Sequence, residues 1–152
     1  GLALPVLLFL TLSVAAERWA HLIGVMNDLL YVCAPAPLQM GVAAGIAELP
    51  ESFYRDMAKE FQQKRDQFCA ALTRAGLAPS IPQGAYYVLA DATRLPGKTG
   101  KERAMALLQT IGLAGVPGEA FFSDQEGARF LRFSYAKTQP DLDEACRRLA
   151  KL

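Results

Sequence analysis

The stretch Phe130-Leu-Arg-Phe-Ser-Tyr135 decides the fold. Every second side chain in it is large and apolar, and this alternation predicts a β-strand with two different faces. The two faces hold Leu131, Phe133 and Tyr135 on one side, and Phe130, Arg132 and Ser134 on the other. We expect the first set to face a core and the second to lie on a half-exposed side of a sheet.

Helix and strand patterns alternate around this stretch from Pro50 onward. Helices are expected over 51–75, from the Thr99–Glu102 capping spacing to Ile111, and from Thr138 to the end of the chain. Strands are expected over 85–90, 113–116 and 130–135, with a loop over 77–84. The order predicts an α/β (α+β) fold, in which helices pack against a small, mostly antiparallel sheet.

The helix over 51–75 carries the clearest periodicity in the chain. Its apolar side chains form one stripe of helical spacing, which consists of Tyr54, Met57, Phe61, Phe68, Leu72 and Ala75. We interpret this stripe as core packing, and Gly76 stands where a helix-terminating glycine is expected. Cys69 and Cys146 fall within helical patterns and are expected to be small buried side chains.

The first 50 residues differ from the rest in charge, because they hold four of the 31 charged residues. Helices are expected over 17–31 and 38–49, the second rich in glycine and alanine and suited to burial. The apolar run 2–16 is similar to the core of a signal peptide but is short for a membrane span. It fits an export signal, a buried segment of a larger protein, or the product of a truncated or rearranged coding sequence.

Composition narrows the classes of function. The chain has 152 residues, 52% of them hydrophobic, and a net charge of +1, which fits one domain or one and a half and argues against nucleic-acid binders and disordered chains. Three widely spaced cysteines form no disulfide framework, and the single histidine, His21, argues against a metal site. We expect a cytoplasmic protein, or an exported one if 2–16 is a remnant of a signal.

Arg132 is the residue that most suggests chemistry. A planar guanidinium between aromatic residues suits bidentate binding of a carboxylate, although an outward-facing surface arginine explains the same pattern. Ser134 and Lys137 match the S-x-x-K pattern of acyl transfer, but a strand end would point them apart. Phosphate-binding G-x-G-x-x-G and P-loop motifs are absent from the sequence.

Five segments together resemble one enzyme family. They are Tyr31-Val-Cys-Ala-Pro-Ala-Pro-Leu-Gln39, the long helix with Arg65 and Phe68, Pro82-Gln-Gly-Ala-Tyr-Tyr87, Gly115-Val-Pro-Gly-Glu-Ala-Phe121, and Leu131-Arg-Phe-Ser-Tyr-Ala136. In this order and spacing they resemble the C-terminal part of class I, fold-type I aminotransferases of the aspartate, kynurenine and diaminopimelate kind. The resemblance covers roughly residues 17–152. It implies pyridoxal phosphate as cofactor in the complete enzyme, amino acids and 2-oxo acids as substrates, and a homodimer, with no nucleic-acid partner and no membrane.

The resemblance also implies roles for individual residues. Arg132 takes the place of the arginine that clamps the substrate α-carboxylate. Five further residues border the mouth of the active site: Gly84, Tyr86, Pro117, Gly118 and Phe121. Gly84 and Tyr86 join Arg132 as candidate substrate-binding residues, while Cys33 and Pro35 would lie near the dimer interface or the entrance.

The sequence departs from the family where the catalytic machinery is concerned. The family's Schiff-base lysine lies in an S-x-[ST]-K segment followed by G-x-R-x-G-Y, and none of the six lysines here has that context. The resemblance therefore implies no catalytic residue, no covalently held cofactor and no metal ligand in this chain.

The implied division is an apolar head over 1–16, a large-domain tail over 17–49 and the small domain over 50–152. The leading hypothesis is a C-terminal portion of an aminotransferase that is inactive alone. The alternatives are a non-catalytic binding or dimerisation module and an exported or membrane-tethered derivative.

Overall fold

The computed structural model describes residues 3–30 and 34–152, with side chains from 15 to 28 and from 34 onward. By its contacts the chain divides into two units, Gly1–Pro50 and Glu51–Leu152. The first holds α1 (Ala3–Leu30) and α2 (Ala36–Glu48). The second holds α3 (Glu51–Arg74), β1 (Ala78–Ser80), β2 (Tyr87–Asp91), α4 (Gly100–Ile111), β3 (Val116–Pro117), the 3-10 turns η1 (Gly118–Ala120) and η2 (Gln125–Arg129), β4 (Phe130–Ser134) and α5 (Gln139–Leu149).

The second unit is built on a four-stranded antiparallel sheet. Its strand order is β1-β2-β4-β3, so β4 lies inside the sheet between β2 and β3. Leu89 of β2 and Val116 of β3 both pair with Arg132 of β4. The expected α/β fold with a small antiparallel sheet is therefore confirmed.

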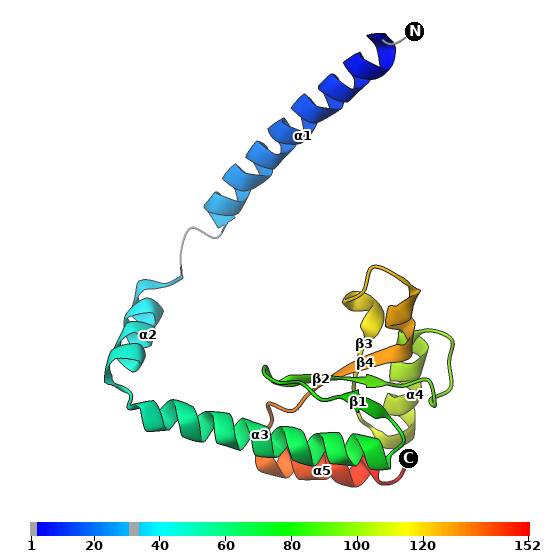
Figure 1. Cartoon of the computed structure of the whole chain (residues 1–152). Helices are drawn as coiled ribbons and strands as arrows, with labels where there is room; N and C mark the ends of the chain where they lie inside the picture. The colour runs from blue at the N-terminus through cyan, green and yellow to red at the C-terminus, as the bar shows by residue number, and fades with distance from the viewer. Residues whose placement is uncertain (1–2, 31–33) are drawn as a thin grey trace. The chain divides into compact units, whose positions relative to one another are not determined.

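The core lies on one face of this sheet. Leu131 and Phe133 of β4 and Val88 of β2 are at most 3% exposed, and they join one apolar cluster with side chains of α3, α4 and α5. The helices α3 and α5 lie side by side along the sheet (Figure 1). The two-faced pattern predicted for 130–135 is confirmed, because Leu131, Phe133 and Tyr135 are buried while the alternate residues are half-buried.

The edge strands differ from the sequence expectation. β1 lies within the segment expected to be a loop, and its Pro79 is accommodated because β1 is an edge strand that needs no second set of hydrogen bonds. β3 covers only Val116–Pro117 instead of 113–116. Gly115 lies so close to the Phe133 ring that a Cβ there would be crowded, and the chain approaches β4 without pairing.

The helix boundaries follow the capping chemistry of the sequence. The Thr99 side chain accepts a hydrogen bond from the backbone N–H of Glu102. The Glu102 carboxylate in turn accepts one from the backbone N–H of Thr99, which completes the capping box of α4. After α3, Gly76 adopts a left-handed conformation with φ of 75°, and Leu77 N–H donates to Leu72 C=O. Both predicted helix ends are confirmed.

The apolar stripe of α3 is only partly core. Phe68, Leu72 and Ala75 are buried, but Tyr54 and Met57 are 39% and 42% exposed within the described residues. The core-packing interpretation is therefore wrong for the first half of the helix, because the sheet covers only its second half. Cys69 is buried and Cys146 half-buried, both are free thiols, and burial raises the pKa of each. Cys33 lies outside the described residues.

The first unit consists of two helices. α1 is continuous from Ala3 to Leu30, so most of the apolar 2–16 segment and most of the helix expected at 17–31 form one helix, and α2 begins after Pro35. No residue of α2 is buried, which leaves Leu38, Val42 and Ile46 more than 60% exposed among the described residues. None of the helices in the described ranges combines the length and hydropathy that crossing a bilayer requires.

Candidate substrate-carboxylate site

Arg132 lies at the middle of β4 on the face of the sheet opposite the helices. Pleating sends Leu131 and Phe133 into the core, so the side chain between them leaves the sheet on the other side. We call this side, with Tyr87, Leu89, Arg132 and Ser134, the open face. Its side chains are half-buried, in contrast to the core face.

Two aromatic rings hold the guanidinium of Arg132. The guanidinium carbon lies 4.2 Å from the ring centre of Tyr87 and 4.1 Å from that of Phe121. Tyr87 comes from β2, diagonally across the antiparallel pair, and Phe121 directly follows η1 beyond β3. Cation–π contacts of this kind use the guanidinium face and leave its N–H edge available.

That N–H edge has no polar partner in the described part of the chain. The other half-buried arginines there are all engaged: Arg65 with Asp66 and Pro82, Arg103 with Lys98 and Ala128, and Arg148 with Glu144 and Gly112. Arg132 makes no hydrogen bond or ion pair with a described residue. A planar cation with free donors in a fixed fork is suited to bidentate binding of a carboxylate.

Tyr86 and Tyr87 lie beside this cation. Their ring centres are 4.2 Å apart, with the Tyr86 side chain 45% exposed. A side-chain hydrogen bond with Tyr87 raises the pKa of Tyr86, while the charge of Arg132 acts in the opposite direction. The structure thus brings the predicted residues Arg132 and Tyr86 together, with Tyr87 between them.

The turn that carries Phe121 is packed tightly. A Cβ at Gly118 would collide with the backbone oxygen of Gly127, so only glycine fits there. Pro117 pairs with Leu131 in the sheet, and Phe121 N–H donates to Gly118 C=O over 2.8 Å. Pro117, Gly118 and Phe121 therefore form the structured border of the Arg132 site.

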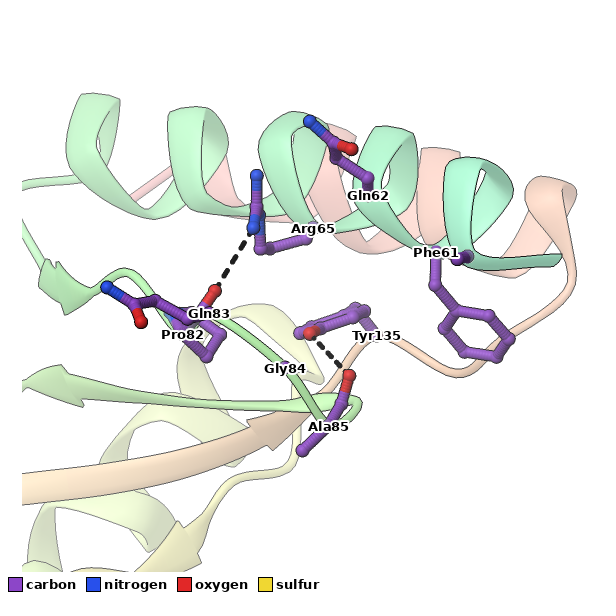
Figure 2. A pocket seen from close by; sticks show the side chains of 9 residues that line it. Phe61, Gln62, Arg65, Pro82, Gln83, Gly84, Ala85 and Tyr135 are labelled. Atoms are coloured by element: carbon purple, nitrogen blue, oxygen red, sulfur yellow. Dashed lines mark hydrogen bonds between the residues drawn. The ribbon is translucent and has the colours of Figure 1, made fainter. Parts of the chain in front are cut away.

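Gly84 lies in a different place from Arg132. It lines a pocket of about 300 Å³ between α3 and the 82–85 turn, shown in Figure 2. The Arg65 guanidinium donates to Pro82 C=O over 3.1 Å, and the Tyr135 hydroxyl donates to Ala85 C=O over 2.9 Å. The left-handed residue of this turn is Ala85, with φ of 62°.

A further cavity of about 410 Å³ lies at the edge of the sheet and includes Arg132, Ser134 and Lys137 in its lining. Ser134 ends β4, and Lys137 follows in the loop before α5. Their side chains share no hydrogen bond among the described residues. The arrangement gives no support to S-x-x-K chemistry.

The lysines are spread over helices and loops. Three of the lysines are on the helices α3 and α4, with Lys64 paired to Glu60 over 2.5 Å, and Lys98 and Lys151 are in loops. Lys137 lines a cavity together with Arg132, and it is exposed on a loop. Within the described residues, no group of three or more histidine, cysteine and acidic side chains is arranged to hold a metal ion.

Tyr87 was missed as a candidate from the sequence. Its alternation with Val88 places it on the open face, but its contact with Arg132 depends on the register between β2 and β4. The resemblance assigns no role to Arg65. Pro35 belongs to the first unit, where it precedes α2, and Cys33 lies outside the described residues.

The chain is similar to known proteins over most of its length. The family model for aminotransferase class I and II matches residues 12–149. A kynurenine–oxoglutarate transaminase of Dictyostelium discoideum is 31% identical over 88% of this chain and 36% of its own length. Two solved structures are also similar: N-succinyldiaminopimelate aminotransferase from Mycobacterium tuberculosis (TM-score 0.72, 29% identity, 82% of this chain and 32% of that one) and an Escherichia coli protein described as having methionine aminotransferase function (TM-score 0.71, 28% identity, 83% and 33%).

The chain spans about a third of the length of these relatives. The family match covers most of the chain, including the strand with Arg132 and both segments that supply its aromatic neighbours. The chain belongs to the class I and II aminotransferase family, whose members use pyridoxal phosphate to move amino groups between amino acids and 2-oxo acids.

Proposed function

We propose that this chain is the C-terminal small-domain portion of an aminotransferase and that Arg132 binds the carboxylate of the amino acid or 2-oxo acid. The observation that carries this proposal is the half-buried guanidinium held between two rings, with its donors unpaired by any described residue. The other half-buried arginines described in the unit are paired with carboxylates or carbonyls. An arginine kept free in this way is suited to an anion from outside the unit.

The chemistry assigned to this chain is orientation. A bidentate contact fixes both carboxylate oxygens, and a fixed carboxylate restricts the directions in which the α-carbon can point. The open face supplies the anchor, with the rings of Tyr87 and Phe121 limiting rotation of the guanidinium. In the complete enzyme pyridoxal phosphate supplies the electron sink. The lysine that forms its Schiff base belongs to the large domain in this proposal.

The exposed apolar surfaces support a role as part of a larger assembly. α2 buries none of its residues, and the first half of α3 exposes Phe53, Tyr54 and Met57. We propose that these surfaces pack against the large domain and the second subunit of a homodimer. The free thiols of Cys69 and Cys146 suit a reducing, cytoplasmic compartment.

A spectrum tests whether the chain itself holds the cofactor. Pyridoxal phosphate added to the purified chain is expected to give no stoichiometric Schiff-base absorption beyond that of a lysine-rich control protein. A specific adduct lost when a single lysine is replaced would contradict the proposal.

Titration with 2-oxoglutarate distinguishes this function from a non-catalytic binding or dimerisation module. The carboxylate anchor predicts weak binding, with a Kd on the order of 10 mM for one charge-assisted bidentate contact, lost on Arg132→Ala. A dimerisation module instead predicts self-association with no perturbation of Arg132.

A further inference from the structure

The turn that places Phe121 on Arg132 is fastened to a neighbouring helix by one carboxylate. Glu119 belongs to η1, two residues before Phe121, and its Oε1 accepts a hydrogen bond of 2.5 Å from the backbone N–H of Gly100. Gly100 is the first residue of α4 and is buried. The contact thus joins the turn beside Arg132 to the first residue of α4.

Two properties of a helix N-terminus favour a carboxylate at this position. The first N–H groups of a helix have no partner within the helix, and the helix dipole favours a negative charge near them. The capping residues engage the N–H groups of Lys98, Thr99 and Glu102, and Glu119 supplies the acceptor for the N–H of Gly100. A Cβ at residue 100 would collide with the Glu119 carboxylate, and glycine at that position keeps room for it.

We infer that Glu119 is a positioning residue, which holds the Phe121 ring against the Arg132 guanidinium by anchoring the 118–121 turn to the N-terminus of α4. This inference rests on the proposed role of Arg132 as the carboxylate anchor. The turn is held at two points, by Gly118 against the Gly127 backbone and by Glu119 on Gly100. Any substitution of Gly118 would add atoms that collide with the Gly127 backbone. The Glu119 side chain, in contrast, can be removed without such a collision.

The chain offers a matched control. Glu102 is also a carboxylate that accepts N–H donors at the start of α4, with its Oε2 2.6 Å from the Lys98 nitrogen. Replacing Glu102 with alanine weakens the same helix end but leaves the 118–121 turn in place. Comparison of Glu119→Ala with Glu102→Ala therefore separates the stability of α4 from the position of Phe121.

Two variants disturb the contact from opposite sides. Glu119→Ala removes the acceptor, and Gly100→Ala places a methyl group where the carboxylate lies. Alanine is well tolerated as the first residue of a helix, so the second variant folds even if the first does not. Glu119→Gln keeps an oxygen acceptor and is the conservative variant.

The readout is the Nε–Hε resonance of Arg132 in the full 152-residue chain, identified by its loss in Arg132→Lys. Aromatic rings this close to the guanidinium shift this resonance upfield. We expect Glu119→Ala and Gly100→Ala to lose much of that shift and to raise the Kd for 2-oxoglutarate about threefold to tenfold, the range of one cation–π contact. Glu119→Gln and Glu102→Ala should stay near the wild-type values.

An unchanged Arg132 resonance in both Glu119→Ala and Gly100→Ala overturns the inference, as does an equal change in Glu102→Ala. The resonance of the unliganded chain tests the position of the ring without 2-oxoglutarate. If the wild-type chain shows no response to 2-oxoglutarate, the proposed function fails while the effect of Glu119 on the resonance is still decided.

Discussion

The two faces of the four-stranded sheet differ in how they are completed. On the core face, Leu131 and Phe133 are at most 3% exposed and every neighbour they need comes from the same unit. On the open face, Arg132 has two aromatic neighbours but no described residue that accepts its hydrogen bonds. The core face explains why the unit folds, and the open face carries the donors that we propose bind a carboxylate.

Two arginines of neighbouring segments sharpen this contrast. Arg129 donates two hydrogen bonds to one Asp91 oxygen, at 2.9 and 2.5 Å, and lies 5.1 Å from the Phe130 ring centre. Arg132, three residues later, has the aromatic contacts without the carboxylate. The difference supports the proposal that Arg129 stabilises the fold while Arg132 binds a carboxylate from another molecule.

The largest expected effect lies on the core face. Phe133→Ala removes a buried ring that packs edge-on against Phe68 and leaves a cavity, which costs about 3–5 kcal/mol of unfolding free energy. Chemical denaturation followed by circular dichroism measures this loss. An equally large destabilisation by Arg132→Ala would remove the distinction between the two faces.

A smaller effect is expected from the rings of the open face. Tyr87→Ala should weaken binding of 2-oxoglutarate about threefold to tenfold, because one of the two cation–π contacts that orient Arg132 is lost. Leu89→Ala is the matched control, since Leu89 pairs directly with Arg132 and has no ring. Equal weakening by both substitutions, measured by NMR titration, would show that the Tyr87 ring has no special role.

The smallest effect concerns the paired arginine and its pH dependence. Burial raises the pKa of Asp91, but hydrogen bonds from Thr93 and Arg129 outweigh this and lower it from 3.8 to about 2. Because the folded-state pKa is depressed, the stabilisation is complete above about pH 4 and is lost as the pH falls towards 2.

Asp91→Asn should lower the unfolding free energy at pH 7 by about 0.5 kcal/mol, a typical value for a largely solvent-screened pair. The difference in stability between this variant and the wild type should shrink as the pH falls from 4 to 2. Thermal melts over that range measure it. A constant difference would contradict the pairing of Asp91 with Arg129.

Much of the fold follows from local sequence features. The alternation in 130–135, the capping residues Thr99 and Gly76, and the periodicity of the second half of α3 each correspond to an observed element. β1 could not be predicted because Pro79 disfavours a strand unless the strand is known to lie at an edge. The exposure of the first half of the α3 stripe could not be predicted either, because periodicity predicts an apolar face without identifying what covers it.

The candidate site was only partly accessible from sequence. Arg132 stands out as a cation in an aromatic strand, and the resemblance supplies its role. Its contacts with Tyr87 and Phe121 depend on strand register and on a turn held by Gly118, both of which are long-range features. Gly84 shows the opposite case, because a conspicuous glycine lines the pocket beside α3 instead of the Arg132 site.

The most direct test compares Arg132 and Arg129 in one experiment. The Nε–Hε resonances of both side chains are followed in the full chain while 2-oxoglutarate is added, with Arg132→Lys and Arg129→Lys used for assignment. The carboxylate anchor predicts a saturable change at Arg132, with Arg129 unaffected and the response abolished in Arg132→Lys. A larger change at Arg129, or undiminished binding by the Arg132→Lys chain, would contradict the assignment of Arg132 as the substrate-carboxylate anchor.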